Sequence, residues 1–174
     1  MRIAYGISAY KNPAHLERLV RRLHAGPAET MFLVHVDSKT ASATYEEMTG
    51  RLADLDGVRF LPRHACYWGG FGHVEASLKV IDAIAGGSER PDHLILLSGQ
   101  DYPIKSNAAI AEFLGARPDR SHFLHFPLPT ENWSHGGLDR INRWHLRRGR
   151  LHVQLPRRRT LPTSLAGGLR STWR

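Results

Sequence analysis

Two polar side chains directly follow an apolar run in the middle of the sequence. Residues 94–97 are all leucine or isoleucine, and Gln100 and Asp101 come just after them. A short continuous apolar run is typical of a strand buried on both faces of a parallel sheet. Ligands of such sheets bind just beyond the carboxyl ends of the strands. We therefore expect the amide of Gln100 and the carboxylate of Asp101 to line a binding site.

Three other segments follow predicted strands in the same way, and they are rich in polar, aromatic or glycine residues: Ser8 and Tyr10, then Asp37, then Trp68, Gly69 and Gly70. Carboxyl ends of parallel strands meet at one edge of the sheet. A nucleotide bound there needs an apolar slot for its base, an acceptor for the ribose hydroxyls, and N–H groups or cations for phosphate. The pattern predicts a nucleotide site.

Asp37 and Trp68 each allow two interpretations. Asp37 could accept the ribose hydroxyls, as an acid after a strand does in dinucleotide-binding folds, or it could simply hold a turn. Trp68 could stack on a ligand while Gly69 and Gly70 let the backbone approach it. It could equally lie in the core, where tryptophan is common.

No metal site is predicted. Asp54 and Asp56 form an Asp-x-Asp pair of the kind that holds divalent ions. The pair lies between a helix and the following strand, however, which places it at the amino edge, opposite the expected site. The eleven histidines show no metal-binding spacing. His35, inside a strand, is interpreted as a hydrogen-bonded core residue.

The elements that position these residues alternate between strand and helix. Asn12 and Pro13 are typical of a helix start, and the apolar residues after them recur at helical spacing. The alternation predicts an α/β, Rossmann-type, mostly parallel sheet with helices on both faces. After the first strand and helix, we expect strands at 31–36, 58–61, 94–97 and 121–126, and helices at 42–55, 72–85 and 107–114. The helix at 72–85 is expected to face inward with Val74, Leu78 and Ile81.

Positive charge is concentrated in the last part of the chain. The formal net charge is +8, yet residues 138–174 contain ten arginines and one acid, which leaves residues 1–137 at about −1. This predicts a domain over residues 1–145 and a basic, irregular tail over 146–174. The tail could contact phosphate, nucleic acid or an anionic membrane, or it could simply be a solvated end.

The single cysteine, Cys66, excludes an internal disulfide and any metal site built on clustered cysteines. The start of the chain resembles neither a signal peptide nor a membrane span. We therefore expect a cytoplasmic protein, peripheral to the membrane at most. The arginine-rich and lysine-poor composition favours a bacterial source.

Four motifs in one order resemble the Core-2/I-branching glycosyltransferases, a family that includes β-1,6-N-acetylglucosaminyltransferases and peptide O-xylosyltransferases. The resemblance covers residues 2 to about 145, and the motifs span residues 9–13, 34–39, 67–76 and 98–105. It implies a GT-A-like fold and inverting transfer of N-acetylglucosamine or xylose from a UDP-sugar to an acceptor hydroxyl with a β-linkage. In the branching enzymes, basic side chains in place of a metal stabilise the departing diphosphate. Eukaryotic members are Golgi membrane proteins.

Site roles follow from the resemblance residue by residue. Asp37 would contact the uridine ribose, with Ser8, Tyr10 and the loop at residues 67–70 beside it. Asp101 would shape the donor pocket. The acceptor, a glycan or a protein, would meet three residues further along the chain: Glu131, Arg140 and Arg143.

The chain departs from the family pattern near its end. The family continues with a Gly-Ser-x-Trp-Trp-like segment, an acidic motif that supplies the catalytic base, and basic residues for diphosphate, all expected beyond Arg174. We therefore expect a domain truncated at the C-terminus and impaired as an enzyme, with Asp101 and Glu75 the only substitute carboxylates. Glu75 is better explained as a structural acid at a helix start. The alternative is a non-catalytic module that binds UDP or glycan, or a remnant whose basic tail binds anions. A specific nucleic-acid role is not expected, because no docking motif accompanies the arginines.

Overall fold

Four parallel strands form the sheet in the first part of the structure, which is a computed structural model that describes residues 1–148 and 151–156. The chain divides into two compact units, residues 1–121 and residues 122–174, each held together by its own internal contacts. The sheet lies in the first unit and has the order β3-β2-β1-β4. Its strands are β1 (Arg2–Ala9), β2 (Glu29–Val36), β3 (Val58–Phe60) and β4 (His93–Ser98).

The strand order reverses beside β1. The chain moves outward from β1 to β2 and β3, then returns to place β4 on the other side of β1. The β1–β2 register runs from Arg2 opposite Glu29 to Ala9 opposite Val36, and Ser8 lies opposite Ser98 of β4. In open sheets, the point where the order reverses is where ligands bind. The carboxyl ends of β1 and β4 are therefore the expected place for a site.

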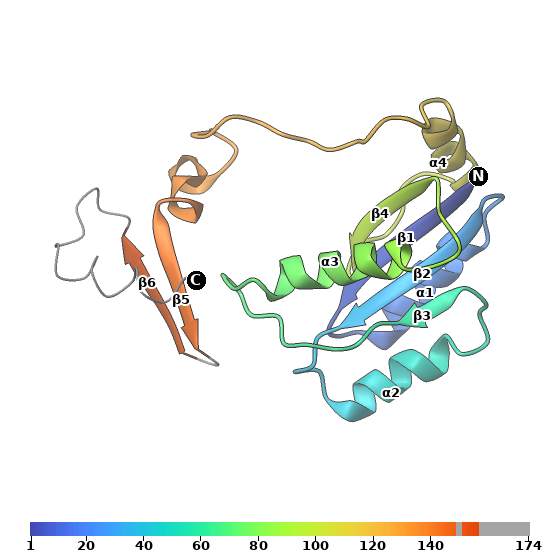
Figure 1. The fold of residues 1–174 in the computed structure, drawn as a ribbon, viewed down its shortest axis with the longest axis horizontal. Coiled ribbons are helices and arrows are strands. Elements are labelled where there is room, and N and C mark those ends of the chain that lie inside the picture. The colour runs from blue at the N-terminus through green and yellow to red at the C-terminus, as the bar shows by residue number, and fades with distance from the viewer. Residues whose placement is uncertain (149–150, 157–174) are drawn as a thin grey trace. The chain divides into compact units, whose positions relative to one another are not determined.

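Helices cover both faces of the sheet, as the alternating pattern predicts (Figure 1). On one face, α1 (Pro13–His24), α2 (Ser42–Arg51) and α4 (Asn107–Gly115) share a core with the strands, built on Phe32, Val34 and Met48 among others. On the other face, α3 (Gly72–Ala85) packs on Leu33 and Leu94 through Val80 and its neighbours. The prediction of a parallel α/β sheet is confirmed.

α1 begins where the sequence predicts, but the side chain of its N-cap residue does not cap the helix. Pro13 occupies the first turn, and Leu16, Leu19, Val20 and Leu23 are all buried. Asn12 stands at the N-cap with φ 60°, in the left-handed region that asparagine tolerates, but its side chain makes no capping hydrogen bond. At α4 the side chain does cap, because Ser106 Oγ accepts the Ala109 N–H at 3.2 Å.

Two predictions are wrong. The inward face of α3 is formed by Ala76 and Val80, whereas Val74, Leu78 and Ile81 are 50%, 44% and 45% exposed. Gly6 of β1 lies against this face, because a Cβ atom on Gly6 would stand 2.8 Å from Val80 Cγ1, so the missing side chain leaves room for Val80. The strand expected at residues 121–126 is also absent: these residues form no strand, and Phe123 and Leu124 are exposed.

The second unit contains a short 3₁₀ helix, η1 (Ser134–Arg140), and an antiparallel hairpin of β5 (Arg143–Arg148) and β6 (Leu151–Pro156). Part of the predicted basic tail thus lies in this hairpin, and the rest of it, residues 157–174, lies outside the described residues. Within the described part of the chain, no helix is long and apolar enough to cross a membrane.

Candidate functional site

The loops that follow β1, β2 and β4 are joined by backbone hydrogen bonds at the carboxyl edge. Gly99 N–H donates to the Ser8 carbonyl at 2.7 Å, and Asp37 N–H donates to the Ala9 carbonyl at 2.9 Å. A Cβ atom at Gly99 would lie 2.9 Å from Ala9 Cβ, so only glycine allows this approach. The structure therefore brings Ser8, Asp37 and the start of the Gln100 turn together, where the strand order reverses.

Asp37 directly follows β2 and is 8% exposed. Its Oδ1 accepts the Lys39 N–H at 2.9 Å, and its Oδ2 lies 3.1 Å from Lys39 Nζ. Burial alone would raise the pKa of this carboxyl, but hydrogen bonds from Lys39 and from the Cys66 backbone outweigh burial and lower it. Asp37 thus holds its own turn as an ionised carboxylate. Its role toward a ribose stays a prediction, and these three hydrogen bonds leave one of its four lone pairs for a hydroxyl.

Lys39 connects the loop after β2 to the loop before α3. Its ammonium group donates to the Cys66 carbonyl, pairs with Asp37 and lies 4.2 Å from the centre of the Tyr67 ring. The side chain is still 43% exposed, although its ammonium group has these three partners within the fold. Sequence reasoning assigned no role to Lys39, although its position two residues after Asp37 is a usable signal for a turn-linked ion pair.

The Trp68 loop projects from the surface. Trp68 is 72% exposed, so the interpretation that places it in the core is wrong. Gly69 has φ 70°, and Gly70 N–H closes the turn on the Tyr67 carbonyl at 3.0 Å. Tyr10, after β1, is likewise exposed. Two aromatic rings are therefore accessible on loops of this edge, which suits a planar base.

Gln100 and Asp101 form the turn after β4. Asp101 Oδ2 accepts the Ser98 N–H at 2.6 Å, and the Gln100 N–H donates to Ser98 Oγ at 3.2 Å. Gln100 Nε2 donates to the Gly99 carbonyl at 3.0 Å. The carboxylate of Asp101 thus holds the turn, so its first role is to position the backbone after β4.

Arg63 braces the Asp37 turn from the side. Its Nη2 donates to the Asp37 carbonyl at 3.0 Å and to the Thr40 carbonyl at 2.6 Å, and its guanidinium lies 4.4 Å from the Tyr45 ring centre. No sequence signal pointed to this residue, because the contact joins segments 26 and 23 residues apart.

His35 is a core residue, as interpreted from its place in a strand. It is 1% exposed, and its Nε2 lies 3.0 Å from His64 Nδ1. Burial, helped by the nearby charges of His64 and Lys79, lowers the pKa of His35 to about 4. Glu75 lies in the first turn of α3, 3.4 Å from Lys79 Nζ and 3.7 Å from His64 Nδ1, so it pairs with basic groups at that helix start.

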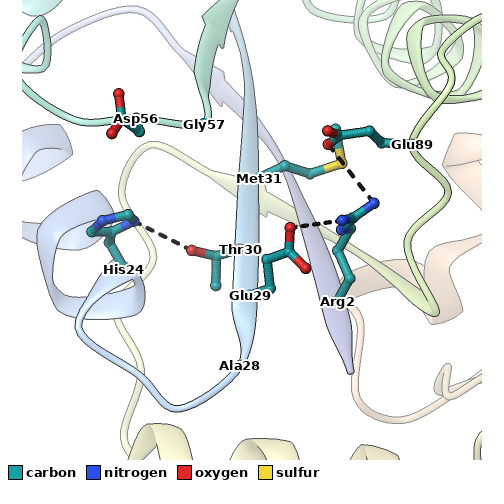
Figure 2. A pocket seen from close by; sticks show the side chains of 9 residues that line it. All are labelled: Arg2, His24, Ala28, Glu29, Thr30, Met31, Asp56, Gly57 and Glu89. Atoms are coloured by element: carbon teal, nitrogen blue, oxygen red, sulfur yellow. Dashed lines mark hydrogen bonds and ion pairs between the residues drawn. The ribbon is translucent and has the colours of Figure 1, made fainter.

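The Asp-x-Asp pair lies away from this edge. Asp54, just after α2, makes an ion pair with Arg21 at 2.7 Å. Asp56 borders a cavity of about 380 Å³ at the amino ends of β1 and β2, seen in Figure 2, where Arg2 reaches toward Glu29 and Glu89. The prediction that this pair is structural and at the opposite edge is therefore consistent with the fold.

The three predicted acceptor residues lie in the second unit. Glu131 is exposed, Arg143 Nη1 donates to Gln154 Oε1 at 3.3 Å across the hairpin, and the side chain of Arg140 lies outside the described residues. Their acceptor role stays a prediction.

The fold and the edge define a class: a parallel α/β domain whose loops suit a nucleotide at the point where the strand order reverses. Comparison of sequences gives the family. The Core-2/I-Branching enzyme family profile matches residues 3–163, and the chain belongs to this family. The resemblance carried by the four motifs is confirmed.

Individual relatives are distant. The chain is 25% identical over 114 residues to human N-acetyllactosaminide beta-1,6-N-acetylglucosaminyl-transferase, covering 64% of this chain and 28% of that protein. It is 29% identical over 124 residues to rat Xylosyltransferase 2, covering 70% of this chain and 14% of that protein. A human beta-1,3-galactosyl-O-glycosyl-glycoprotein beta-1,6-N-acetylglucosaminyltransferase is 26% identical over 113 residues, 64% of this chain and 26% of its own length. The chain thus spans less than a third of each of these relatives.

Proposed function

We propose that residues 1–121 form the donor-binding part of an inverting glycosyltransferase with a GT-A-like fold. The donor is a UDP-sugar, and the sugar, N-acetylglucosamine or xylose, passes to a hydroxyl of a glycan or protein acceptor with a β-linkage. Family membership and the names of the relatives support the class of reaction. The observation that carries the proposal for this chain is Asp37, buried and ionised beside the point where the strand order reverses.

Each edge residue has a task in this proposal. Asp37 accepts the ribose hydroxyls, Tyr10 and Trp68 contact the base, and Gln100 with Asp101 shapes the pocket wall. Lys39, whose side chain is 43% exposed, supplies a positive charge that offsets the charge of the diphosphate. No metal is needed for this chemistry, and the base that takes the acceptor proton is supplied from outside residues 1–121.

A second function, a non-catalytic UDP or glycan module, is favoured by the state of the carboxylates. Asp37 and Asp101 hold turns, and Glu75 pairs with Lys79 and His64. None of these three is free to take a proton from an acceptor. We therefore propose that this chain alone binds donor and transfers sugar slowly or not at all. A cytoplasmic or membrane-peripheral location, a bacterial source and anion binding by the basic tail stay predictions.

Calorimetric titration of the full chain with UDP tests the binding step. Asp37→Asn should weaken binding by at least about tenfold, since a hydrogen bond to a charged acceptor is lost. Asp56→Asn, at the amino edge, is the matched control and should bind UDP as the parent does. Equal UDP binding by the two variants would remove Asp37 from the donor site.

A transfer assay separates the two functions. The full chain is mixed with UDP-N-acetylglucosamine or UDP-xylose and a range of acceptors, and sugar transfer is measured. UDP binding without transfer supports the binding module. Turnover on the order of 1 per second, within the usual enzyme range, would show that the catalytic base lies within this chain.

A further inference from the structure

Five polar side chains gather between the sheet and the first half of α3, on the opposite face from Phe32 and Val34. Two of them, His35 and Cys66, are buried, and the others are partly exposed. We call this group the His35 cluster, which consists of His35, His64, Cys66, Glu75 and Lys79. Neither the donor site nor the family comparison gives it a role.

Hydrogen-bond partners fix the protons of the two histidines. His64 Nε2 lies 2.7 Å from the Gly72 carbonyl oxygen, which can only accept, so Nε2 carries the hydrogen. His64 Nδ1 then presents a lone pair, toward which Lys79 Nζ points from 2.9 Å. His35 Nε2 accepts the backbone N–H of His64 at 3.2 Å, so this nitrogen presents a lone pair as well.

These two lone pairs face each other. His35 Nε2 and His64 Nδ1 lie 3.0 Å apart, a distance that suits a hydrogen bond but has no hydrogen to supply it in this arrangement. A cation that both nitrogens can contact removes the repulsion. The carboxylate of Glu75, 3.7 Å from His64 Nδ1, adds negative charge at the same point.

Cys66 completes a set of metal-binding atoms. One atom each from His35, His64 and Cys66 can be chosen so that all three lie within 4.8 Å of one another. Cys66 Sγ now donates to the Gly72 carbonyl oxygen at 3.3 Å and lies 3.7 Å from His64 Nε2, so it must turn toward His64 Nδ1 to join the site. We propose that the His35 cluster binds a zinc ion through these three residues, with Glu75 or water as the fourth ligand. Two imidazole nitrogens and a thiolate are ligands that Zn²⁺ prefers over Mg²⁺ or Ca²⁺.

The geometry requires small movements. Tetrahedral zinc with bonds of about 2.0–2.1 Å to nitrogen sets its nitrogen ligands roughly 3.4 Å apart. The present 3.0 Å between His35 Nε2 and His64 Nδ1 therefore has to widen by a few tenths of an ångström. The Lys79 ammonium, now the cation beside His64, moves toward solvent, and the His64 backbone N–H gives up His35 Nε2 as its acceptor. The Cys66 thiol releases its proton to water as the Zn–S bond forms.

The proposed ion stabilises the loop that contains His64 and Cys66, and this loop is linked to Asp37 through Lys39. The Cys66 carbonyl accepts from Lys39, which in turn holds Asp37. Fixing Cys66 and His64 thus fixes the loop that leads to Trp68. The role is structural, so it is compatible with metal-independent sugar transfer, and it stands whether or not the donor proposal holds.

Cobalt titration of the full chain, after chelator treatment, tests the proposal. We expect one Co²⁺ per chain, a near-ultraviolet thiolate-to-cobalt charge-transfer band, and displacement of Co²⁺ by Zn²⁺. Cys66→Ser should abolish the band and weaken Co²⁺ binding by at least about tenfold. Absence of binding at micromolar Co²⁺, or an unchanged spectrum in Cys66→Ser, would overturn the proposal.

Two further variants distinguish loss of the metal site from loss of the fold. His73→Ala, exposed on the same helix, is the matched control and should bind Co²⁺ like the parent. Lys79→Met removes the competing cation, so it should tighten Co²⁺ binding several-fold. Unchanged or weaker binding in Lys79→Met would show that a metal does not take the place of the ammonium. UDP titration of the same samples reports separately on the donor site.

Discussion

Gly6 of β1 lies directly under Val80 of α3, so close that a Cβ atom on Gly6 would stand 2.8 Å from Val80 Cγ1. Leu96 of β4 would be equally near, at 2.9 Å from its Cδ2. The central strand therefore carries no side chain at the one point where the helix crosses it. The buried face of α3 therefore includes the residue that lies over Gly6.

Gly6→Ala should destabilise the fold by about 1–3 kcal/mol, because an added methyl group overpacks a filled site. Gly50→Ala is the matched control: Gly50 lies in α2 and a Cβ there meets nothing within 4 Å. That change should be neutral or stabilise by up to about 1 kcal/mol. Urea unfolding of both variants gives the comparison, and equal effects would contradict the close packing of α3.

The exposed side of α3 should tolerate polar residues. Leu78→Gln should change the free energy of unfolding by no more than about 0.5 kcal/mol, as at other surface positions. Val80→Ala, two residues later on the buried face, should cost about 1–3 kcal/mol. Thermal unfolding followed by circular dichroism measures both. A large loss in Leu78→Gln would mean that something covers this face in solution.

Arg63→Lys should weaken UDP binding although Arg63 is not expected to contact UDP. Both bonds come from Nη2, and lysine has a shorter side chain and lacks the planar guanidinium that packs on the Tyr45 ring. It therefore cannot hold the same two bonds in place, and the turn that aims Asp37 loosens. We expect a rise in the UDP dissociation constant of about tenfold by calorimetry. Arg59→Lys, whose contact is with Ala83 of α3, serves as the control and should leave the constant unchanged.

Acid should weaken the link between α1 and α2 through Glu17. Hydrogen bonds from Arg51 and then Arg21 hold the pKa of Glu17 below its ordinary 4.5. A lowered pKa means that the stabilisation is complete above pH 4.5 and is lost as the pH falls through the folded-state value. Glu17→Gln should therefore show a smaller loss of stability in this range than the parent chain.

Thermal unfolding between about pH 5 and 3 measures the effect of Glu17, and about 1 M salt should reduce it because the pairs are at the surface. Glu46→Gln, an exposed change on α2, is the control and should follow the parent. Parallel pH curves for the parent and Glu17→Gln would contradict the ion-pair account.

Local patterns predicted most of the first unit. The spacing of Leu16, Val20 and Leu23 identified α1 and its buried face because both depend on neighbours in sequence. For α3 the same reasoning found the helix but chose the larger residues as its inner face, since nothing near Val80 in sequence reveals Gly6 beneath it. The strand expected at residues 121–126 rested on a short run with apolar residues at 123, 124 and 126, and a run of that length does not by itself determine a strand.

The site could be predicted only where it follows strand ends. Asp37 and Asp101 stand out because each follows an apolar run at the edge where ligands bind. Arg63 and His64 were missed, since their partners lie 26 and 29 residues away in sequence and no spacing rule joins them. The turn bonds of Asp37 and Asp101 also need coordinates, because a carboxylate that holds a turn and one that awaits a ligand look alike in a sequence.

The order β3-β2-β1-β4 has a consequence for handling the protein. Within residues 1–121, β4 is hydrogen-bonded to β1 alone, so the backbone groups on its other side are open. Its residues after His93 are uncharged and mostly apolar, and Leu96 is half exposed. An open strand of this kind is a template for strand addition from another chain. Residues 1–121 prepared by themselves should therefore tend to self-associate as their concentration rises.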